Sequence, residues 1–350
     1  MAKRIIRRSR TRCSISAAAW PTDSELDSLL AVLAGSPMIV ISGQRIAREI
    51  GVTRSTVWRW IVRLRGLGVK VKGHPRSGYH IEKIPDVLLP GLLRERLVGS
   101  AFGKRIHHFF KTDSTNRVAL ELGQAGEPHG AIVIAEEQTA GRGRVGRAWH
   151  SERSSGLYLS LLLRPQLIPA QAPMLTLVAG LAVRDAVEEV QGGDGAQGAV
   201  DLRWPNDVLI GGKKISGVLT EMYAEPDRVK FVVCGIGINV NHTKLPAEIS
   251  GIATSLRMAG GRQQSRIEVV VRLLRHFEGY YNQFLRDGAG PIVKRFGEVS
   301  SFARGKRIRV TSGQETFPAV TAGLDPSGLL IVTRENGSKE LLLSADISEA

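Results

Sequence analysis

The apolar residues of the N-terminal region recur at helical spacing in three short segments. Residues 22–35 place four leucines on one face of a helix, and residues 43–50 form a second amphipathic segment after Ser42, a favoured N-cap residue. Residues 51–53 then turn into a third helix over 54–68, and the alternating residues 69–81 predict a two-stranded ribbon. Together these elements predict a winged helix-turn-helix over residues 21–84.

Residues 85–300 alternate between apolar strands and amphipathic helices, which is typical of a mixed α/β domain. We expect a linker helix at 88–97, strands at 131–137, 156–163 and 229–241, a hairpin at 201–223, and helices at 172–190 and 263–287. Residues 301–350 are short alternating segments between turn signals, which predicts a small β-barrel. The predicted fold class is therefore α+β and multidomain, with boundaries at 21–84, 85–300 and 301–350.

The net charge of +15 is concentrated at the N-terminus, because residues 1–84 hold 16 Lys and Arg against 5 Asp and Glu. This excess favours phosphate contacts over a protein-interaction domain of the same shape. The candidate DNA-binding residues, in the third helix and the ribbon, are Arg54, Ser55, Trp58, Arg59, Arg63 and Arg76. The basic, acid-free residues 1–20 resemble a transit peptide, but they show no clear amphipathic helix, and we expect a disordered tail or an over-extended start.

Cysteine content and hydropathy bear on the compartment. Cys13 and Cys234 are far apart, so they predict neither a disulfide framework nor a metal pair, and this favours a reducing cytoplasm. No apolar run reaches the roughly 18 residues that a membrane-spanning helix needs, so we do not expect a membrane protein.

The segment 141–149, GRGRVGRAW, is the most informative stretch of the chain. It matches the letters of a dinucleotide-binding turn, but an apolar strand follows it where that turn needs a helix. An RGG-like nucleic-acid tail is the alternative, but such tails repeat and this segment occurs once between two strands. Arg142, Arg144 and Arg147 on a glycine-rich backbone therefore predict a loop that wraps an anion.

Several further polar clusters lie near the expected ends of strands and helices. Ser114, Thr115 and Asn116 begin a helix, where Ser and Thr are most often plain caps, and Lys214 lies in a hairpin turn that is often just solvated. The other polar residues of these clusters are Gln138, Asn206, Asp207 and Asn239. The set combines cations for phosphate, an oxygen pair for a divalent ion and polar groups for an organic ring. Because the chain has no P-loop, this indicates activation of a small acid by a nucleotide in another fold.

The motifs DSTN (113–116), EEQTAGRGRVGRAW (136–149), WPND (204–207), KISGVLTE (214–221) and GIGIN (235–239) occur in an order that resembles the biotin protein ligases, in their bifunctional form that also represses the biotin operon. The resemblance covers residues 22–350. It implies a winged helix-turn-helix, a catalytic domain related to class II tRNA synthetases, as in the biotin and lipoate ligases, and an SH3-like C-terminal barrel. It also implies formation of biotinyl-5′-AMP from biotin and ATP with Mg²⁺.

In the second step of that reaction, biotin passes to a lysine of the biotin carboxyl carrier protein of acetyl-CoA carboxylase. The resemblance further implies an adenylate-bound homodimer that binds operator DNA. The implied catalytic residues are Arg144, Lys214 and Asp207, with Asp207 also a metal ligand. The implied biotin contacts are Ser114, Thr115, Asn116, Gln138, Gly141, Arg142, Arg144, Lys214 and Gly217, and the implied adenylate contacts are Arg144, Arg147, Trp149, Asn206 and Asn239.

Three positions depart from the family pattern. Arg203 precedes WPND where a Lys is usual, Trp58 occupies a position that usually carries a short polar side chain, and the C-terminus lacks a basic residue found in some relatives. Two alternatives stay open at this point: a lipoate or octanoate ligase of the same fold, and a transcription regulator that senses biotin without ligating it.

Overall fold

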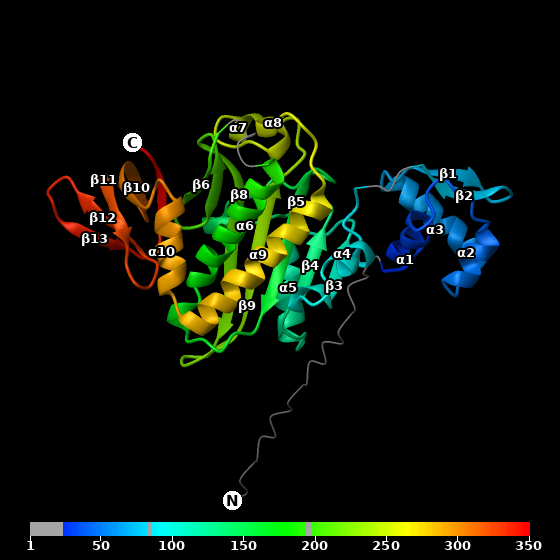
Figure 1. Ribbon diagram of the computed structural model, residues 1–350, viewed down its shortest axis with the longest axis horizontal. Coiled ribbons are helices and arrows are strands. Elements are labelled where there is room, and N and C mark those ends of the chain that lie inside the picture. Colours follow the sequence, from blue (N-terminus) through cyan, green and yellow to red (C-terminus); the bar gives the residue numbers. More distant parts are fainter. Residues whose placement is uncertain (1–23, 83–85, 193–197) are drawn as a thin grey trace, which may run out of the picture.

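The computed structural model describes residues 24–82, 86–192 and 198–350. The expected basic tail at 1–20 lies outside the described residues. The described chain forms three parts in a row, with the N-terminal helices at one end, a large sheet covered by helices in the middle and a small sheet at the other end (Figure 1).

The N-terminal part is a winged helix-turn-helix, as the sequence predicts. It contains α1 (Ser24–Ala34), α2 (Gly43–Glu49), α3 (Arg54–Gly66) and the antiparallel strands β1 (Val71–His74) and β2 (Gly78–Ile81). Side chains cap both later helices, since Ser42 Oγ accepts from the Arg45 amide at 3.2 Å and Thr53 Oγ1 from the Thr56 amide at 3.2 Å. Apolar residues of all three helices and of both strands form one buried core.

The central part is a seven-stranded sheet in the order β3-β4-β5-β9-β8-β7-β6. Only β3 and β4 pair in parallel, and the other neighbours are antiparallel. The strands are β3 (Ile106–Phe109), β4 (Ala131–Ala135), β5 (Gly156–Leu163), β6 (Val200–Arg203), β7 (Asp207–Ile210), β8 (Lys213–Ala224) and β9 (Val229–Asn239). The helices around it are α4 (Pro90–Arg96), α5 (Thr115–Gln124), α6 (Met174–Gln191), α7 (Ala247–Ser250), α8 (Leu256–Gly260), α9 (Arg266–Asp287) and α10 (Gly290–Val299).

The two faces of this sheet carry separate cores. Ile132 and Ile134 of β4 pack into the core that contains α6 and α9, whereas the alternating Ala131 and Val133 face α5. This alternation is the two-residue period of a strand, and because both faces are covered the strands read as nearly continuous apolar runs. Polar residues in these strands therefore lie at strand ends or have buried partners.

A buried chain of charges joins the N-terminal part to the central sheet. His108 of β3 lies 2.8 Å from Asp27 Oδ1 of α1 and 3.3 Å from Glu136 Oε1, just beyond β4. Arg266 of α9 is 2.7 Å from Glu136 and 3.1 Å from Asp86. His108, Glu136 and Arg266 are each at most 1% exposed, so each depends on its charged neighbours for compensation.

The C-terminal part is an antiparallel sheet in the order β13-β12-β11-β10-β14. Its strands are β10 (Arg304–Ser312), β11 (Glu315–Leu324), β12 (Leu330–Arg334), β13 (Lys339–Leu342) and β14 (Asp346–Glu349). Among the described residues no strand pairing joins β13 to β14, so the sheet is all-β but is not closed by hydrogen bonds. The turn between β11 and β12 packs on the central part, where Trp204 Nε1 donates to the Gly328 carbonyl at 3.0 Å.

No helix in the described ranges combines the length and the apolar character that crossing a bilayer requires.

Candidate active site

Residues 141–149, called here the Arg-Gly loop, lie in the connection between β4 and β5 and fold back on themselves. The Trp149 amide donates to the Gly141 carbonyl at 2.8 Å and the Gly143 amide donates to the Arg147 carbonyl at 2.6 Å, so the two arms of the loop run side by side. At its tip is a single 3₁₀ turn rather than an α-helix, which excludes a dinucleotide-binding turn as the sequence predicts. Val145, 82% exposed, has φ 53°, a conformation that β-branched residues rarely adopt.

Trp149 lies over a floor of glycines. Gly217 of β8 and Gly237 of β9 are register partners, and a Cβ atom on Gly237 would lie 2.4 Å from the Trp149 ring. A Cβ atom on Gly217 would lie 3.1 Å from the same ring. A real Cβ atom does not approach as closely as 2.4 Å, and 3.1 Å is tighter than most such contacts, so the indole occupies space that glycine leaves free. The glycines of KISG and GIG therefore shape a slot for Trp149.

Cations gather at the hairpin end of the pocket. Asp207 forms ion pairs with two of them, with Arg203 Nη2 at 2.6 Å from Oδ2 and Lys214 Nζ at 2.5 Å from Oδ1. The Lys214 contact is an ion pair without hydrogen-bond alignment, so Asp207 Oδ1 accepts no hydrogen bond from any described residue. Lys214 also lies 5.6 Å from the centre of the Trp149 ring. Arg203 thus forms a charge pair with Asp207.

Arg144 and Arg147 face the C-terminal sheet. Arg144 donates to Asn206 Oδ1 at 3.1 Å and to Ser344 Oγ at 3.0 Å, and Arg147 lies 2.5 Å from Asp346 Oδ2. Burial lowers the pKa of Arg144, opposed by the charges of Asp346 and Asp207. Asp346 of β14 thus brings a carboxylate to the cationic end of the cavity.

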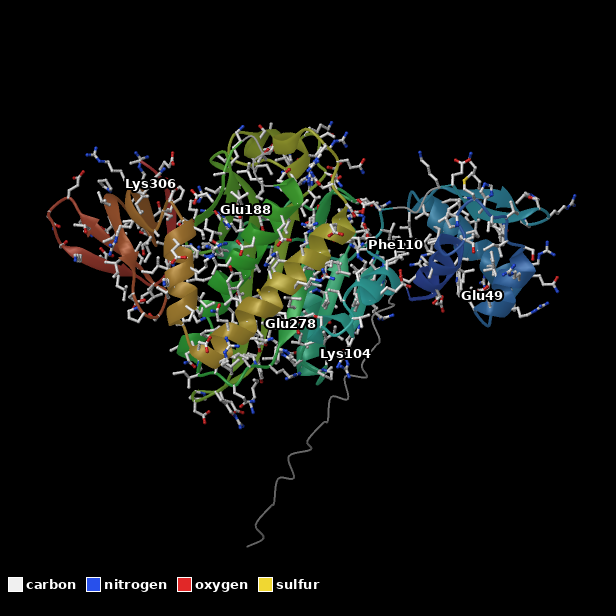
Figure 2. The ribbon with its side chains drawn as sticks, viewed as in Figure 1. Glu49, Lys104, Phe110, Glu188, Glu278 and Lys306 are labelled. Carbon is white, nitrogen blue, oxygen red and sulfur yellow. The ribbon has the colours of Figure 1, made fainter. Side chains whose placement is uncertain are left out.

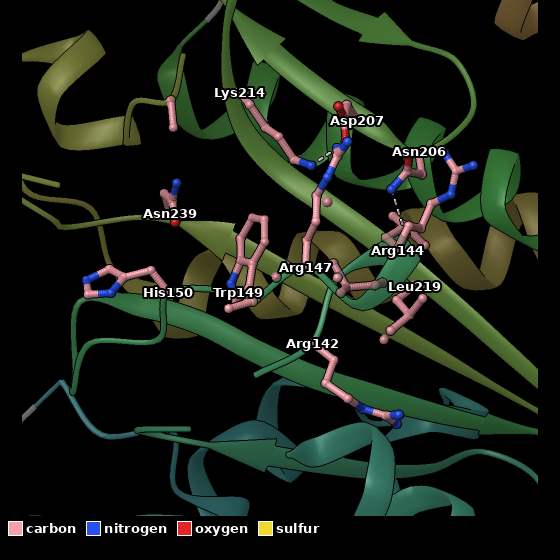
Figure 3. Close-up of a pocket in the computed structure, with 18 of the residues that line it drawn as sticks. Arg142, Arg144, Arg147, Trp149, His150, Asn206, Asp207, Lys214, Leu219 and Asn239 are labelled. Atoms are coloured by element: carbon pink, nitrogen blue, oxygen red, sulfur yellow. Dashed lines mark hydrogen bonds and ion pairs between the residues drawn. The ribbon is translucent and has the colours of Figure 1, made fainter. Parts of the chain in front are cut away.

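Arg142 points away from the other two arginines (Figure 3). Its guanidinium donates to Glu221 of β8 at 3.0 Å and 3.1 Å. The sequence groups the three arginines around one anion, but the structure directs two toward the hairpin end and one toward α5. Glu221 also accepts from Asn116 at 2.7 Å, so it joins the loop to the start of that helix.

An uncharged polar cluster lies at this opposite end. Gln138 Oε1 accepts from the Thr115 amide at 2.8 Å and from Thr115 Oγ1 at 3.1 Å, while Gln138 Nε2 donates to Ser151 at 2.9 Å. Ser160 of β5 donates to Thr115 Oγ1 at 2.8 Å and to Asn116 Oδ1 at 2.6 Å. Ser114 is the N-cap residue of α5, but its side chain makes no capping hydrogen bond.

Sequence reasoning missed Ser160 and Glu221. Each has a visible signal: Ser160 is the one polar residue in the run GLYLSLLL, and Glu221 is an acid within the motif KISGVLTE. A buried hydroxyl in an apolar strand needs a partner, and here the partners are Thr115 and Asn116.

The two polar ends line one cavity of about 230 Å³. The segment 241–254, whose sequence NHTKLPAEISGIAT is loop-like, contains the short helix α7 and contributes Ile249, Ile252 and Ala253 to the wall. It docks through the Lys214 backbone, whose amide donates to the Ile252 carbonyl at 2.9 Å. Asn239 also lines the cavity, and its Nδ2 donates to the Thr254 carbonyl at 3.0 Å.

The carboxylates that line the cavity are Asp207 and Asp346. Mg²⁺ is commonly bound through one or two carboxylates plus substrate phosphates. Asp207 fits such a role because Oδ1 accepts no hydrogen bond from the described residues, although two neighbouring cations already offset its charge. The donor set therefore suits a metal ion that arrives with phosphate oxygens.

The six candidate DNA-binding residues are all exposed. Trp58 is 49% exposed and Val62, one turn further along α3, is 48% exposed, so this helix presents an apolar strip among its arginines. Arg54 is directed to the wing, where Nη2 donates to the Pro75 carbonyl at 2.5 Å. Arg65 likewise donates to the carbonyls of Val71 and Gly73, which fixes the ribbon against α3.

Three family models match successive parts of the chain. They are an HTH domain over residues 26–80, the biotin/lipoate A/B protein ligase family over 109–239 and the biotin protein ligase C terminal domain over 304–348.

Relatives and a solved structure agree with these matches. The bifunctional ligase/repressor BirA of Bacillus subtilis is 39% identical over 309 residues, covering 88% of this chain and 93% of the relative. The biotin–[acetyl-CoA-carboxylase] ligase of Mycobacterium tuberculosis is 35% identical over 257 residues, covering 72% of this chain and 92% of that protein. The structure of biotin protein ligase from Aquifex aeolicus in complex with biotin and ATP matches with a TM-score of 0.60 at 30% identity, covering 71% of this chain and 100% of that one. The chain therefore belongs to the biotin protein ligase family, in its bifunctional ligase/repressor branch.

Proposed function

We propose that this chain joins biotin to ATP as biotinyl-5′-AMP and then transfers the biotinyl group to a lysine of a biotin carboxyl carrier protein. The observation that carries this proposal is one cavity with an uncharged polar cluster at one end and cations at the other, where Trp149 lies on its glycine floor beside Lys214. Such a cavity suits a neutral ring with an acidic tail at one end and a nucleotide phosphate at the other. Relatives with this activity in their names align over most of the chain.

At the polar end, Ser114, Thr115, Asn116 and Gln138 offer donors and acceptors to the ureido ring of biotin, and Ser160 and Ser151 hold this set in place. The backbone of Gly141 and Arg142 completes this end, while Gly217 leaves room beside Lys214 and Trp149. These hydrogen bonds orient polar side chains within the sheet, so the ring meets preformed partners.

At the cationic end, Lys214 and Arg144 stabilise the charge that develops when the biotin carboxylate attacks the α-phosphate and pyrophosphate leaves. Arg147 contacts the departing phosphates, Trp149 packs on adenine, and Asn206 and Asn239 orient the phosphates. Asp207 would hold Mg²⁺ when the nucleotide is bound, and the ion would supply positive charge that offsets the pyrophosphate charge. In the second step a lysine amine attacks the mixed anhydride and AMP leaves, so the enzyme forms no covalent intermediate.

The N-terminal domain supports operator binding that depends on biotinyl-AMP, with the chain acting as a homodimer. Arg54, Ser55, Arg59, Arg63 and Arg76 present polar groups for phosphates or bases, and Trp58 presents an apolar surface suited to thymine methyl groups. Affinity for the operator should fall steeply with salt, because phosphate neutralisation releases counterions. A gel shift insensitive to salt, or absent with biotinyl-AMP, would contradict this half of the proposal.

We also infer that the C-terminal sheet belongs to an SH3-like barrel, which the match of residues 304–348 to the biotin protein ligase C terminal domain supports. Its β14 supplies Asp346 to the active-site cavity.

The adenylation step is tested by incubating the chain with ATP, Mg²⁺ and either biotin or lipoate, and measuring pyrophosphate release. We expect release with biotin and little with lipoate, because the polar end offers hydrogen-bond partners that a dithiolane ring cannot use. Equal or greater release with lipoate would identify a lipoate ligase, and release with neither would indicate a sensor without catalysis.

A further inference from the structure

A cluster of potential metal ligands lies at the edge of the active-site cavity, which His150 itself lines, and no role has been assigned to its members above. His150 and Glu152 follow Trp149 in the loop between β4 and β5, and His242 lies just beyond the end of β9. One ligand atom from each of the three residues lies within 4.8 Å of the others. Figure 3 shows His150 on the Asn239 side of the pocket, away from Asp207. The cluster is thus separate from the carboxylate proposed to meet Mg²⁺.

The two imidazoles of the cluster lie close to each other. Their ring centres are 5.9 Å apart and their planes are tilted by 49°. Two histidines that share a tetrahedral Zn²⁺, with Zn–N distances of about 2.0–2.1 Å, have ring centres roughly 5 Å apart. A shift of under about 1 Å in the exposed His150 side chain would bring the ring centres to that separation, a small adjustment for a surface residue.

His242 supplies an independent observation. It is 1% exposed, and its Nδ1 atom is buried without a hydrogen-bond partner among the described residues. Its other ring nitrogen lies 3.5 Å from the Tyr158 hydroxyl, which in turn donates to the Glu152 carbonyl at 2.9 Å. A metal-bound histidine usually has its second nitrogen engaged in this way. An unsatisfied buried nitrogen costs stability, and a metal ion would satisfy it.

The surrounding charges permit a cation. Arg266 lies near His242, but Glu136 and Asp86 neutralise it at 2.7 Å and 3.1 Å. Among the described residues no ion pair engages the Glu152 carboxylate, so its negative charge is available. Two neutral imidazoles and one carboxylate are the three-ligand set of many Zn²⁺ sites, which leave a fourth position for water.

We propose that His150, Glu152 and His242 form a binding site for a divalent transition-metal ion, of which Zn²⁺ fits the ligand set best. Imidazole ligands bind Zn²⁺, Co²⁺ and Ni²⁺, whereas Mg²⁺ selects oxygen ligands. The bound ion ties the segment after the Arg-Gly loop to the end of β9, and so it fixes the backbone next to Trp149.

Equilibrium dialysis of the untagged, metal-free full chain against Zn²⁺, with Mg²⁺ present in excess, tests the site. We expect one Zn²⁺ per chain, and binding weakened at least about tenfold in His150→Gln and in Glu152→Gln, since loss of outer partners alone costs 10- to 100-fold. Both residues are on the surface, so these variants should fold. In the same titration Co²⁺ should give the visible absorption of low-coordinate cobalt, and His242→Gln should abolish it.

His276→Gln is the matched control, because His276 pairs with Glu189 at 2.8 Å on the surface of α9 and offers only a two-residue set. It should bind Zn²⁺ as the parent chain does. Equal affinity in the parent and in Glu152→Gln, or loss of binding in His276→Gln alone, would overturn the proposal. Biotin and ATP are absent from this experiment, so its failure leaves the proposed ligase function untouched.

Discussion

Adding a single methyl group at Gly237 should weaken ATP binding and leave biotin binding nearly unchanged. A Cβ atom there would lie 2.4 Å, 2.5 Å and 2.8 Å from three atoms of the Trp149 ring. Carbon atoms are in ordinary contact at about 3.5–4.0 Å, so the indole must move away by about 1 Å. Trp149 is the proposed adenine platform, and therefore the displacement falls on the nucleotide.

The expected magnitude follows from overpacking. Forcing an extra carbon into a filled site typically costs about 1–3 kcal/mol, and every 1.4 kcal/mol corresponds to a tenfold change in affinity. If the cost appears in the bound complex, Gly237→Ala should raise the Kd for ATP by roughly tenfold.

Gly235→Ala makes the same change at the polar end of the cavity. Its Cβ atom would lie 1.9 Å from Asn116 Oδ1, which accepts from Ser160 at the polar end of the cavity. We therefore expect this variant to weaken biotin binding more than ATP binding. Gly279→Ala is the control, because that glycine lies in α9 with no atom within 4 Å of the added carbon.

Isothermal titration of each variant with biotin and with a non-hydrolysable ATP analogue, together with its thermal midpoint, separates the cases. Equal losses for both ligands in Gly235→Ala and Gly237→Ala, at unchanged thermal midpoints, would refute the assignment of the two ends. Loss in Gly279→Ala would show that the effect is not local.

Three further predictions concern the charges. Burial alone would lower the pKa of His108, but hydrogen bonds to Asp27 and Glu136 raise it to about 9. The stabilisation of the fold by protonated His108 is therefore complete below about pH 6.5 and is lost as pH rises through 9. The thermal midpoint should fall over this window, and it should fall less in His108→Gln. Asp346→Asn should lower the KM for ATP by up to about fivefold, because Asp346 competes with phosphate for Arg147 and an exposed ion pair contributes up to about 1 kcal/mol; an unchanged or higher KM would contradict this. Arg144→Gly should release biotinyl-AMP and label bystander proteins, as read by streptavidin blot, and strict selectivity in that variant would exclude the proposed retention role.

The sequence predicted those features that depend on neighbouring residues. The sequence predicts one hairpin over 201–223 with Lys214 in its turn, and it misses the further turn at 204–206 between β6 and β7. The cap Ser42 and the glycine-rich loop between two strands follow from local patterns. The separation of Arg142 from Arg144 does not, because it depends on where β8 brings Glu221.

Long-range pairing explains the rest of what the sequence did not reveal. Gly217 and Gly237 form a floor only because β8 and β9 are paired in that register. His108, Glu136 and Arg266 come from three distant segments, and a lone buried charge in a sequence does not name its partner. Figure 2 shows Phe110 between the N-terminal helices and the central sheet, where it joins the buried core of the N-terminal part. The edges of the C-terminal sheet, β13 and β14, likewise follow from strand pairing rather than from sequence spacing.

The central claim is tested most directly by incubating the purified full chain with ATP, Mg²⁺, biotin and a biotin carboxyl carrier domain, and by following the carrier by intact-mass spectrometry. We expect a mass gain of one biotin on the carrier and none when its target lysine is replaced. An unmodified carrier, with no biotinyl-AMP formed by the chain, would contradict it.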